Sequence, residues 1–136
     1  MTGSNPQTAR FPPVAENLAP ARNFVRDYIA RHQWQGRDLD VVIAVGEVLQ
    51  NIIRHGFGGG SRDGGVVMTV AIEEAGTLLI TIEDTAPSSI PAEWSNDGRE
   101  AHQGGLGLGI VARIASDAVF EPIPTGNRAT LRFMPD

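Results

Sequence analysis

The sequence lacks two residue types, and each absence limits the chemistry open to it. It contains no cysteine, which excludes disulfides and thiolate metal sites. It contains no lysine either, and all 11 basic side chains are arginines, so a phosphate would be held by arginine, histidine or backbone N–H groups. No apolar run reaches the roughly 18 residues of a membrane span, so we expect no contact with a membrane.

Charge and length narrow the class of protein further. The formal net charge of −5 argues against direct binding to nucleic acid, which requires a basic patch. With 136 residues, 41% of them apolar, we expect a single domain over residues 1–136, with residues 1–7 as a flexible tail. The first residues lack the basic start and apolar stretch of a signal peptide. These features predict a soluble, cytoplasmic protein.

The order of the predicted elements describes a two-layer fold. Helices are predicted over residues 17–33, 38–56 and 107–116. Strands are predicted over residues 8–11, 65–73, 78–83, 117–121 and 129–133. Residues 84–105 form a long predicted loop, and such loops are usually functional or mobile. We predict an α+β sandwich with helices on one face of a mixed, mostly antiparallel sheet.

The central predicted helix, residues 38–56, carries a polar stripe on an otherwise apolar surface. Glu47, Asn51 and His55 follow one another at i, i+4 and i+8, which is one face of a regular helix. A carboxamide oxygen suits Mg²⁺, and a neighbouring carboxylate can accept a proton from an attacking hydroxyl or water. The alternative is a polar helix face that satisfies nearby backbone groups, and spacing alone slightly favours it.

A glycine-rich segment, GGLGLG at residues 104–109, precedes the last predicted helix. Glycines let backbone approach a phosphate closely, and a helix N-terminus offers free N–H groups and a positive dipole end. No Gly-Lys-Ser/Thr follows, so the segment is not a P-loop, and it does not open a strand-turn-helix unit as a dinucleotide fingerprint would. The alternative is a hinge or a tight turn.

Asp84 follows the strand predicted over residues 78–83. A carboxylate in this place can accept a hydrogen bond from an exocyclic amine of a ligand. Because aspartate also favours the first position of a turn, turn chemistry is the better explanation for Asp84 taken alone.

The order of these segments resembles a known family. The helical E-x-x-x-N motif (Glu47, Asn51), the strand followed by Asp84 and the G-x-G-x-G motif resemble the N, G1 and G2 boxes of one ATP-binding fold. This is the Bergerat-type fold of the GHKL superfamily, shared by gyrase-type ATPases and sensor histidine kinases. The small size and the ending GNRATLRF are most similar to the anti-sigma-factor serine/threonine kinases of bacterial partner switching. The likeness extends from about residue 18 to residue 133.

The resemblance implies a role for each matching residue. Asn51 would bind a Mg²⁺ ion that bridges the ATP phosphates, and Glu47 would be the general base toward a serine hydroxyl of a partner protein. Asp84 would take the adenine amino group. Thr130, on the last strand, would help to fix the adenine pocket, and His55 would line the pocket near the phosphates or the ribose.

The remaining ATP-binding positions implied by the resemblance come from the G1 and G2 boxes. They are Ala86, Gly104, Gly105, Leu106, Gly107, Leu108 and Gly109. The glycines at 105, 107 and 109 would wrap the phosphates as a lid closes. Arg99 and His102 are the candidate phosphate contacts of the long loop.

The chain departs from the family pattern in its G1 box. The family reads Asp-x-Gly, whereas this chain reads Asp84-Thr85-Ala86-Pro87. Ala86 adds a methyl group where the family has bare backbone, and a positive φ at this position would cost an alanine energy. We therefore expect adenine binding to be weakened or reshaped.

The resemblance implies an ATP- and Mg²⁺-binding anti-sigma regulatory factor. It would bind a sigma factor or a similar transcription regulator, and it would phosphorylate a serine or threonine of a STAS-type antagonist protein. A homodimer is a further expectation. The alternative is a degenerate GHKL-fold module that sequesters a regulatory partner without catalysis, which the altered G1 box supports. A third hypothesis is an ATPase module that acts on water.

Overall fold

The computed structural model describes residues 4–86 and 106–136. The elements in chain order are β1 (Ser4–Phe11), α1 (Leu18–Arg31), α2 (Asp38–Asn51), β2 (Val66–Ile72), β3 (Leu78–Asp84), α3 (Leu106–Ile114), β4 (Asp117–Ile123) and β5 (Gly126–Phe133). A short 3₁₀ turn (Ala15–Asn17) precedes α1, and a π-helical turn (Ile52–Gly56) continues α2. Among these residues, no helix is both long and apolar enough to cross a bilayer.

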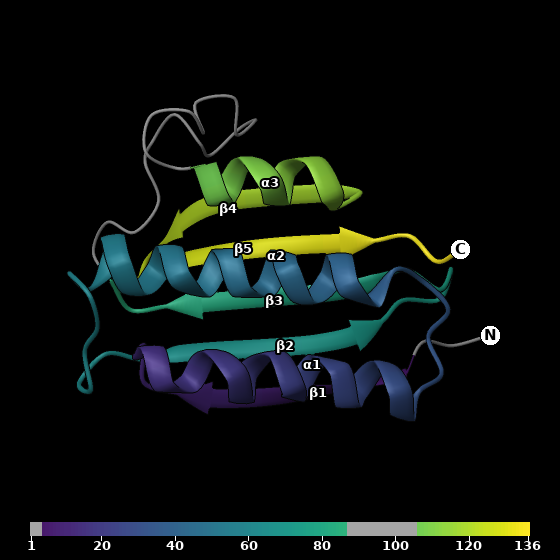
Figure 1. Ribbon diagram of the computed structural model, residues 1–136, viewed down its shortest axis with the longest axis horizontal. Helices are drawn as coiled ribbons and strands as arrows, with labels where there is room; N and C mark the ends of the chain where they lie inside the picture. Colours follow the sequence, from purple (N-terminus) through teal and green to yellow (C-terminus); the bar gives the residue numbers. More distant parts are fainter. Residues whose placement is uncertain (1–3, 87–105) are drawn as a thin grey trace.

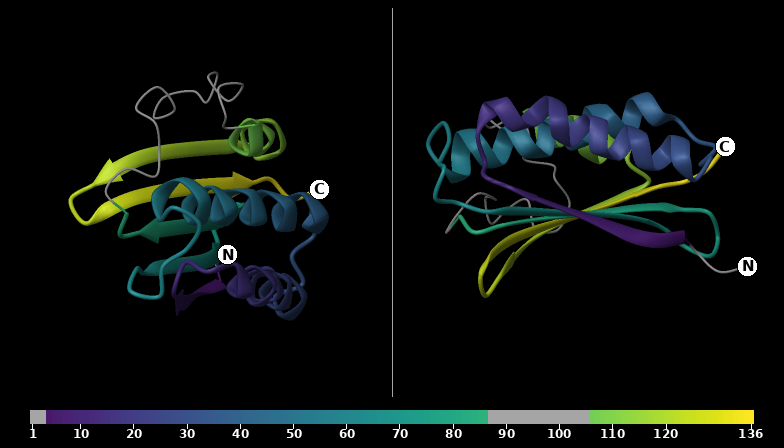
Figure 2. Two further views of the ribbon diagram at one scale, coloured as in Figure 1. Left: turned by 60° about the vertical axis from the view of Figure 1, so that its left-hand side comes forward. Right: turned by 90° about the horizontal axis from the view of Figure 1, so that it is seen from below.

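The strands form one sheet in the order β1-β2-β3-β5-β4, and all three helices lie against one of its faces (Figure 1; Figure 2). This confirms the predicted two-layer α+β architecture. Every pair of neighbouring strands is antiparallel, so the described sheet has no parallel component. The other face of the sheet carries no layer of described residues (Figure 2).

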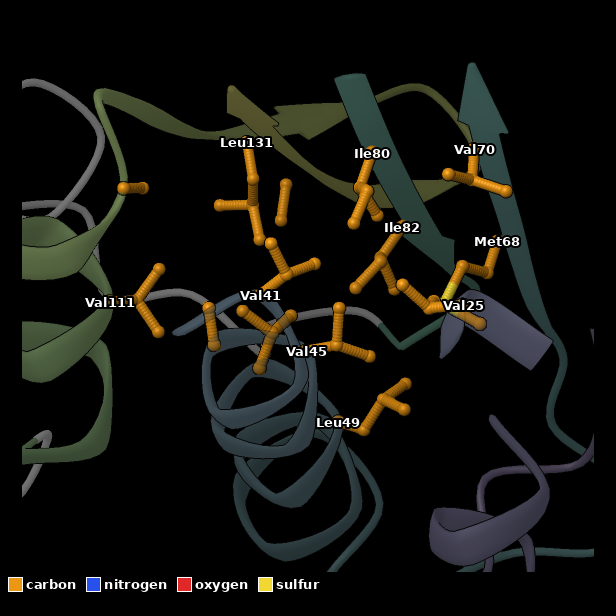
Figure 3. Packing of buried hydrophobic residues seen from close by; sticks show 14 of the residues in the cluster. Val25, Val41, Val45, Leu49, Met68, Val70, Ile80, Ile82, Val111 and Leu131 are labelled. Carbon is orange, nitrogen blue, oxygen red and sulfur yellow. The ribbon is translucent and has the colours of Figure 1, made fainter. Parts of the chain in front are cut away.

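The core lies between the sheet and the helices, because apolar residues alternate along the strands. In β3, the side chains of Leu78, Ile80 and Ile82 are fully buried, whereas the residues between them are only half-buried. All three belong to the core cluster, in which Ile80 and Ile82 pack toward Val41 and Val45 on α2 (Figure 3). The period of two thus selects the face of the sheet that the helices cover.

The helix α2 is less enclosed than its apolar composition predicts. It buries seven residues, including Val41, Val45 and Leu49, but Leu39 is 61% exposed and Ile43 is 39% exposed. A two-layer fold leaves the outer side of each helix open to solvent, so an apolar residue on that side has no layer to cover it.

Some predicted boundaries need correction. The strand β1 begins at Ser4, so residues 4–7 belong to the sheet rather than to the predicted tail, and residues 1–3 lie outside the described part. The side chain of Asn17, which precedes α1, donates to the carbonyl of Pro12 at 2.9 Å and makes no capping hydrogen bond.

The uncovered face of the sheet carries polar side chains arranged in rows. Cross-strand pairing aligns one row of threonines over four strands: Thr8, Thr69, Thr81 and Thr130. In the next row, Arg128 Nε lies 2.9 Å from a carboxylate oxygen of Glu83. That hydrogen bond, with the charges of Glu83 and Glu121, raises the pKa of Arg128.

Candidate nucleotide site

Four ends of secondary structure meet at one end of the molecule. The C-terminal ends of α2 and β3 lie there, together with the beginnings of β5 and α3 (left side of Figure 1). The antiparallel pairing of β3 with β5 brings two of these ends together, because the last residue of β3 faces the start of β5. The segments that the sequence singled out therefore come from distant parts of the chain to one end of the fold.

Glu47 and Asn51 keep the predicted relation on α2. They lie one helical turn apart, and both are half-buried. Within residues 4–86 and 106–136, the side chain of Glu47 makes no hydrogen bond or ion pair. Its carboxylate thus has its acceptor capacity available for a ligand hydroxyl or for water.

The stripe does not continue regularly to His55, because α2 changes its winding after Asn51. The N–H of Phe57 donates to the carbonyl of Ile52 at 3.2 Å, an i to i+5 bond that defines a π turn. This wider turn alters the direction in which His55 projects, and its side chain is exposed. Isolated π turns often occur at functional sites. A role for His55 at the ligand stays a prediction.

Asp84 is the last residue of β3, and its side chain is only 4% exposed on the helix-covered face of the sheet. A buried carboxylate requires donors. Its Oδ1 accepts one hydrogen bond from the backbone N–H of Ala86 at 2.8 Å and another from Nδ2 of Asn127 at 3.1 Å. These two donors fix the carboxylate in a defined orientation.

Asn127 is a site residue that the sequence analysis missed. It is 2% exposed, and the same Nδ2 group also donates to the carbonyl of Ala86 at 2.8 Å. The last strand is predicted only from residue 129, whereas β5 already begins at Gly126. The signal in the sequence is alternation: Asn127 is in phase with Ala129, Leu131 and Phe133, which are all buried.

The backbone at Ala86 does not have the conformation expected from the family's glycine. Gln33 is the one non-glycine residue with positive φ in the described ranges, so Ala86 carries no such strain. Ala86 is completely buried, with its N–H on Asp84 and its carbonyl on Asn127. The expected strain at this position is therefore wrong, and its methyl group fits the turn.

Gly126 lets the two strands approach each other at the site. A Cβ at this position would lie 1.8 Å from the backbone oxygen of Asp84, and φ is +152°. Only glycine fits both conditions. On the other side of the turn, Thr85 and Gly65 exchange two hydrogen bonds of 3.0 and 3.2 Å, which extend the pairing of β2 with β3.

The structure does not bring Thr130 together with the other predicted site residues. Residues that face each other across β3 and β5 share a face, and Asp84 pairs with Asn127 while Thr130 pairs with Thr81. The side chain of Thr130 therefore lies on the uncovered face of the sheet, opposite to Asp84. It cannot contact a ligand that is held between the sheet and the helices.

The glycine-rich segment is partly helical. The helix α3 begins at Leu106, so Gly107 and Gly109 lie in its first turn, and Gly104 and Gly105 lie outside the described residues, as do Arg99 and His102. Leu108 is 1% exposed and belongs to the core, so that only its backbone could serve a ligand. The first four N–H groups of α3 have no partner within the helix and are suited to bind an anion.

The donor set at this end fits a Mg²⁺–nucleotide complex better than a metal ion alone. The described residues hold no group of three or more His, Asp or Glu side chains that could bind a metal. Mg²⁺ needs few protein ligands when phosphates and water complete its shell, and the carboxamide of Asn51 offers a suitable oxygen. The buried carboxylate of Asp84 adds an acceptor suited to an amine.

Comparison of the fold gives three informative relatives. The RsbU and RsbW domains of Rv1364c from Mycobacterium tuberculosis match with a TM-score of 0.68 and 19% identity over 96% of this chain. The chain spans only 32% of the length of that protein chain. The catalytic domain of the histidine kinase ThkA matches with a TM-score of 0.57 and 12% identity, over 96% of this chain and 99% of that one.

The third relative is the histidine kinase domain of the blue-light activated kinase EL346 from Erythrobacter litoralis. It has a TM-score of 0.52 and 23% identity over 71% of this chain and 43% of its own. These identities establish a shared fold and nothing finer. A search of curated protein sequences gives no match. The family model of the histidine kinase-like ATPase domain, in contrast, matches residues 11–133. The chain thus belongs to the histidine kinase-like ATPase family.

Proposed function

We propose that the chain is an ATP-binding protein serine/threonine kinase of the anti-sigma type. The observation that carries the proposal is the buried carboxylate of Asp84, held by two donors at the end of the fold where α2 presents Glu47 and Asn51. The carboxylate of Asp84 suits the amine of a base, whereas Glu47 and Asn51 suit a nucleophile and the phosphates. Both lie within the family's ATP-binding fold.

The residues divide the work of phosphoryl transfer between binding and proton transfer. When bound, Mg²⁺·ATP supplies the phosphoryl group together with a cation that neutralises its charge. Asn51 would contribute an oxygen ligand to the cation. The half-buried carboxylate of Glu47, one turn away, would accept the proton of the attacking serine or threonine hydroxyl. Positioning and charge neutralisation would supply most of the acceleration.

The backbone at the start of α3 is the proposed contact for the phosphates. Its first N–H groups have no partner within the helix, and Gly107 and Gly109 add no side chain of their own to that backbone. The chain has no lysine for this purpose. The partners that the family resemblance suggests are a sigma factor or a similar regulator and a STAS-type antagonist, which would be the phosphorylated protein.

The first test is isothermal titration with Mg²⁺·ATP. We expect micromolar binding by the native protein and loss of that binding in Asn51→Ala. The matched control is Gln50→Ala, a change at the adjacent, half-buried position of α2, which should leave binding intact. Failure of the native protein to bind ATP or ADP, with the fold intact by circular dichroism, would reject the proposal.

The second test separates a kinase from a sequestering module. Radiolabelled ATP is incubated with the protein and a panel of STAS-domain proteins from the same organism. We expect label on one of them, and we expect Glu47→Gln to abolish transfer while nucleotide affinity stays within about twofold of the native value. Binding without transfer to any panel member would favour the sequestering module, and release of phosphate without a protein acceptor would favour an ATPase.

A further inference from the structure

Asn127 lies outside the three sequence motifs, yet it is hydrogen-bonded to two residues of one of them, Asp84 and Ala86. Its carboxamide is 2% exposed, and both hydrogens of Nδ2 are used, one on Asp84 Oδ1 at 3.1 Å and one on the Ala86 carbonyl at 2.8 Å. The orientation of the amide follows from chemistry, since a flipped group would place its oxygen against two acceptors. Asn127 thus connects β5 to the turn that follows β3.

The contacts close into a triangle. Ala86 donates its N–H to Asp84 Oδ1 at 2.8 Å, so Asp84, Ala86 and Asn127 are each bonded to the other two. The close approach of Gly126 to the backbone oxygen of Asp84 holds the start of β5 against this turn. The torsion angle χ2, which sets the orientation of an aspartate carboxylate, otherwise varies widely. Two donors on one oxygen remove that freedom and fix the orientation of the carboxylate.

We propose that Asn127 is a positioning residue for base recognition: it orients the carboxylate of Asp84 toward the exocyclic amine of the bound nucleotide. This inference rests on the proposed nucleotide site and deepens it. Asn127 acts through Asp84, and therefore its removal should affect only nucleotides that carry the amine. A residue that merely stabilises the fold would affect all nucleotides alike.

The test compares two ligands by isothermal titration with Mg²⁺: ADP, and purine riboside 5′-diphosphate, which lacks the exocyclic amine. The native protein should prefer ADP. In Asn127→Ala, affinity for ADP should fall about tenfold or more, as expected when an ordered hydrogen bond to a charged group is lost. Affinity for the amine-free nucleotide should stay within about twofold, since there is no such bond to lose.

Thr130→Ala is the matched control, because it alters a polar residue of the same strand on the opposite face. It should change neither affinity. Equal weakening of both nucleotides by Asn127→Ala, or the same ligand-selective loss in Thr130→Ala, would overturn the assignment. A native protein that binds both nucleotides equally would also overturn it and would leave the nucleotide site itself standing. A native protein that binds neither would instead reject the proposed function.

A measurement on the native protein covers the case in which the alanine variant fails to fold. The Nδ2 protons of Asn127 give their own signals in a ¹H–¹⁵N NMR spectrum. We expect these signals to shift on addition of ADP and to move clearly less with purine riboside 5′-diphosphate at equal saturation. Identical shifts with both nucleotides would contradict the inference.

Discussion

Replacing Gly126 by alanine should disturb the stability of the fold and the nucleotide site together. The added Cβ would lie 1.8 Å from the backbone oxygen of Asp84 and 2.9 Å from the Cα of Thr85. Contacts of a Cβ below 3.0 Å essentially never occur, so the strands must separate by about 1.2 Å at this point. The obstacle is backbone, which cannot rotate away as a long side chain can.

The cost follows from two separate effects. Alanine at φ of +152° occupies a sparsely populated conformation, which costs about 1 to 3 kcal/mol. Overpacking against a fixed backbone adds about 1 to 3 kcal/mol. We therefore expect Gly126→Ala to lower the free energy of unfolding by about 2 to 6 kcal/mol, a large part of the 5–15 kcal/mol that is typical of a domain.

Gly58→Ala separates the two effects. Gly58 also has a positive φ, +60°, but no atom lies within 4 Å of a Cβ built there. It should therefore cost only the backbone term, about 1 to 2 kcal/mol. The assay is urea unfolding monitored by circular dichroism, with unchanged m-values required for the comparison. Equal loss of stability in the two variants would refute the argument from the close contact with Asp84.

Three other substitutions test the packing of the core, the hydrogen bond between Trp34 and Gly76, and the charged side chains around Arg128. Met68→Ala should lower the free energy of unfolding in urea by about 2–5 kcal/mol, because the side chain is fully buried. Trp34→Phe removes the 2.7 Å hydrogen bond from the indole N–H to the Gly76 carbonyl and should cost about 1 kcal/mol in the same assay. Arg128 has a raised pKa, so its contribution is present at every pH below the ordinary arginine pKa and is lost only as the pH rises beyond it. Native protein and Arg128→Gln should therefore show parallel stability profiles between about pH 6 and 9, and diverging profiles would contradict this.

The layers of the fold could be predicted because their signals are local. Alternating apolar residues in the segments LLITIE and GVVMTVAIE select one face, and the helical period of residues 38–51 supplies the surface that covers it. Boundaries were less accurate, since they depend on partners elsewhere in the chain. The strand β1 begins at Ser4 because β2 offers pairing as far as Ile72, which the local sequence of residues 4–7 does not reveal.

The helical part of the site was predictable for the same reason, and its strand part was not. Glu47 and Asn51 need only the helical period to come together. Ala86 seemed strained because the family has glycine there, and only the three-dimensional turn shows its φ to be negative. The π turn that moves His55 off the stripe also has no sequence signature that we can name, since no proline interrupts residues 38–56.

Thr130 and Asn127 show how a pattern and a resemblance can disagree. The resemblance assigned a pocket role to Thr130, yet the strand that contains it alternates with buried Ala129, Leu131 and Phe133. A period of two places Thr130 on the other face and Asn127 on the buried one, so the sequence already contained the correction. Because Asn127 lies next to Gly126, its local sequence favours a turn instead. The hydrogen bond from Asn127 to Asp84 therefore depends on the face of β5 that Asn127 occupies. The alternation of buried residues along the strand determines that face, whereas the family resemblance does not.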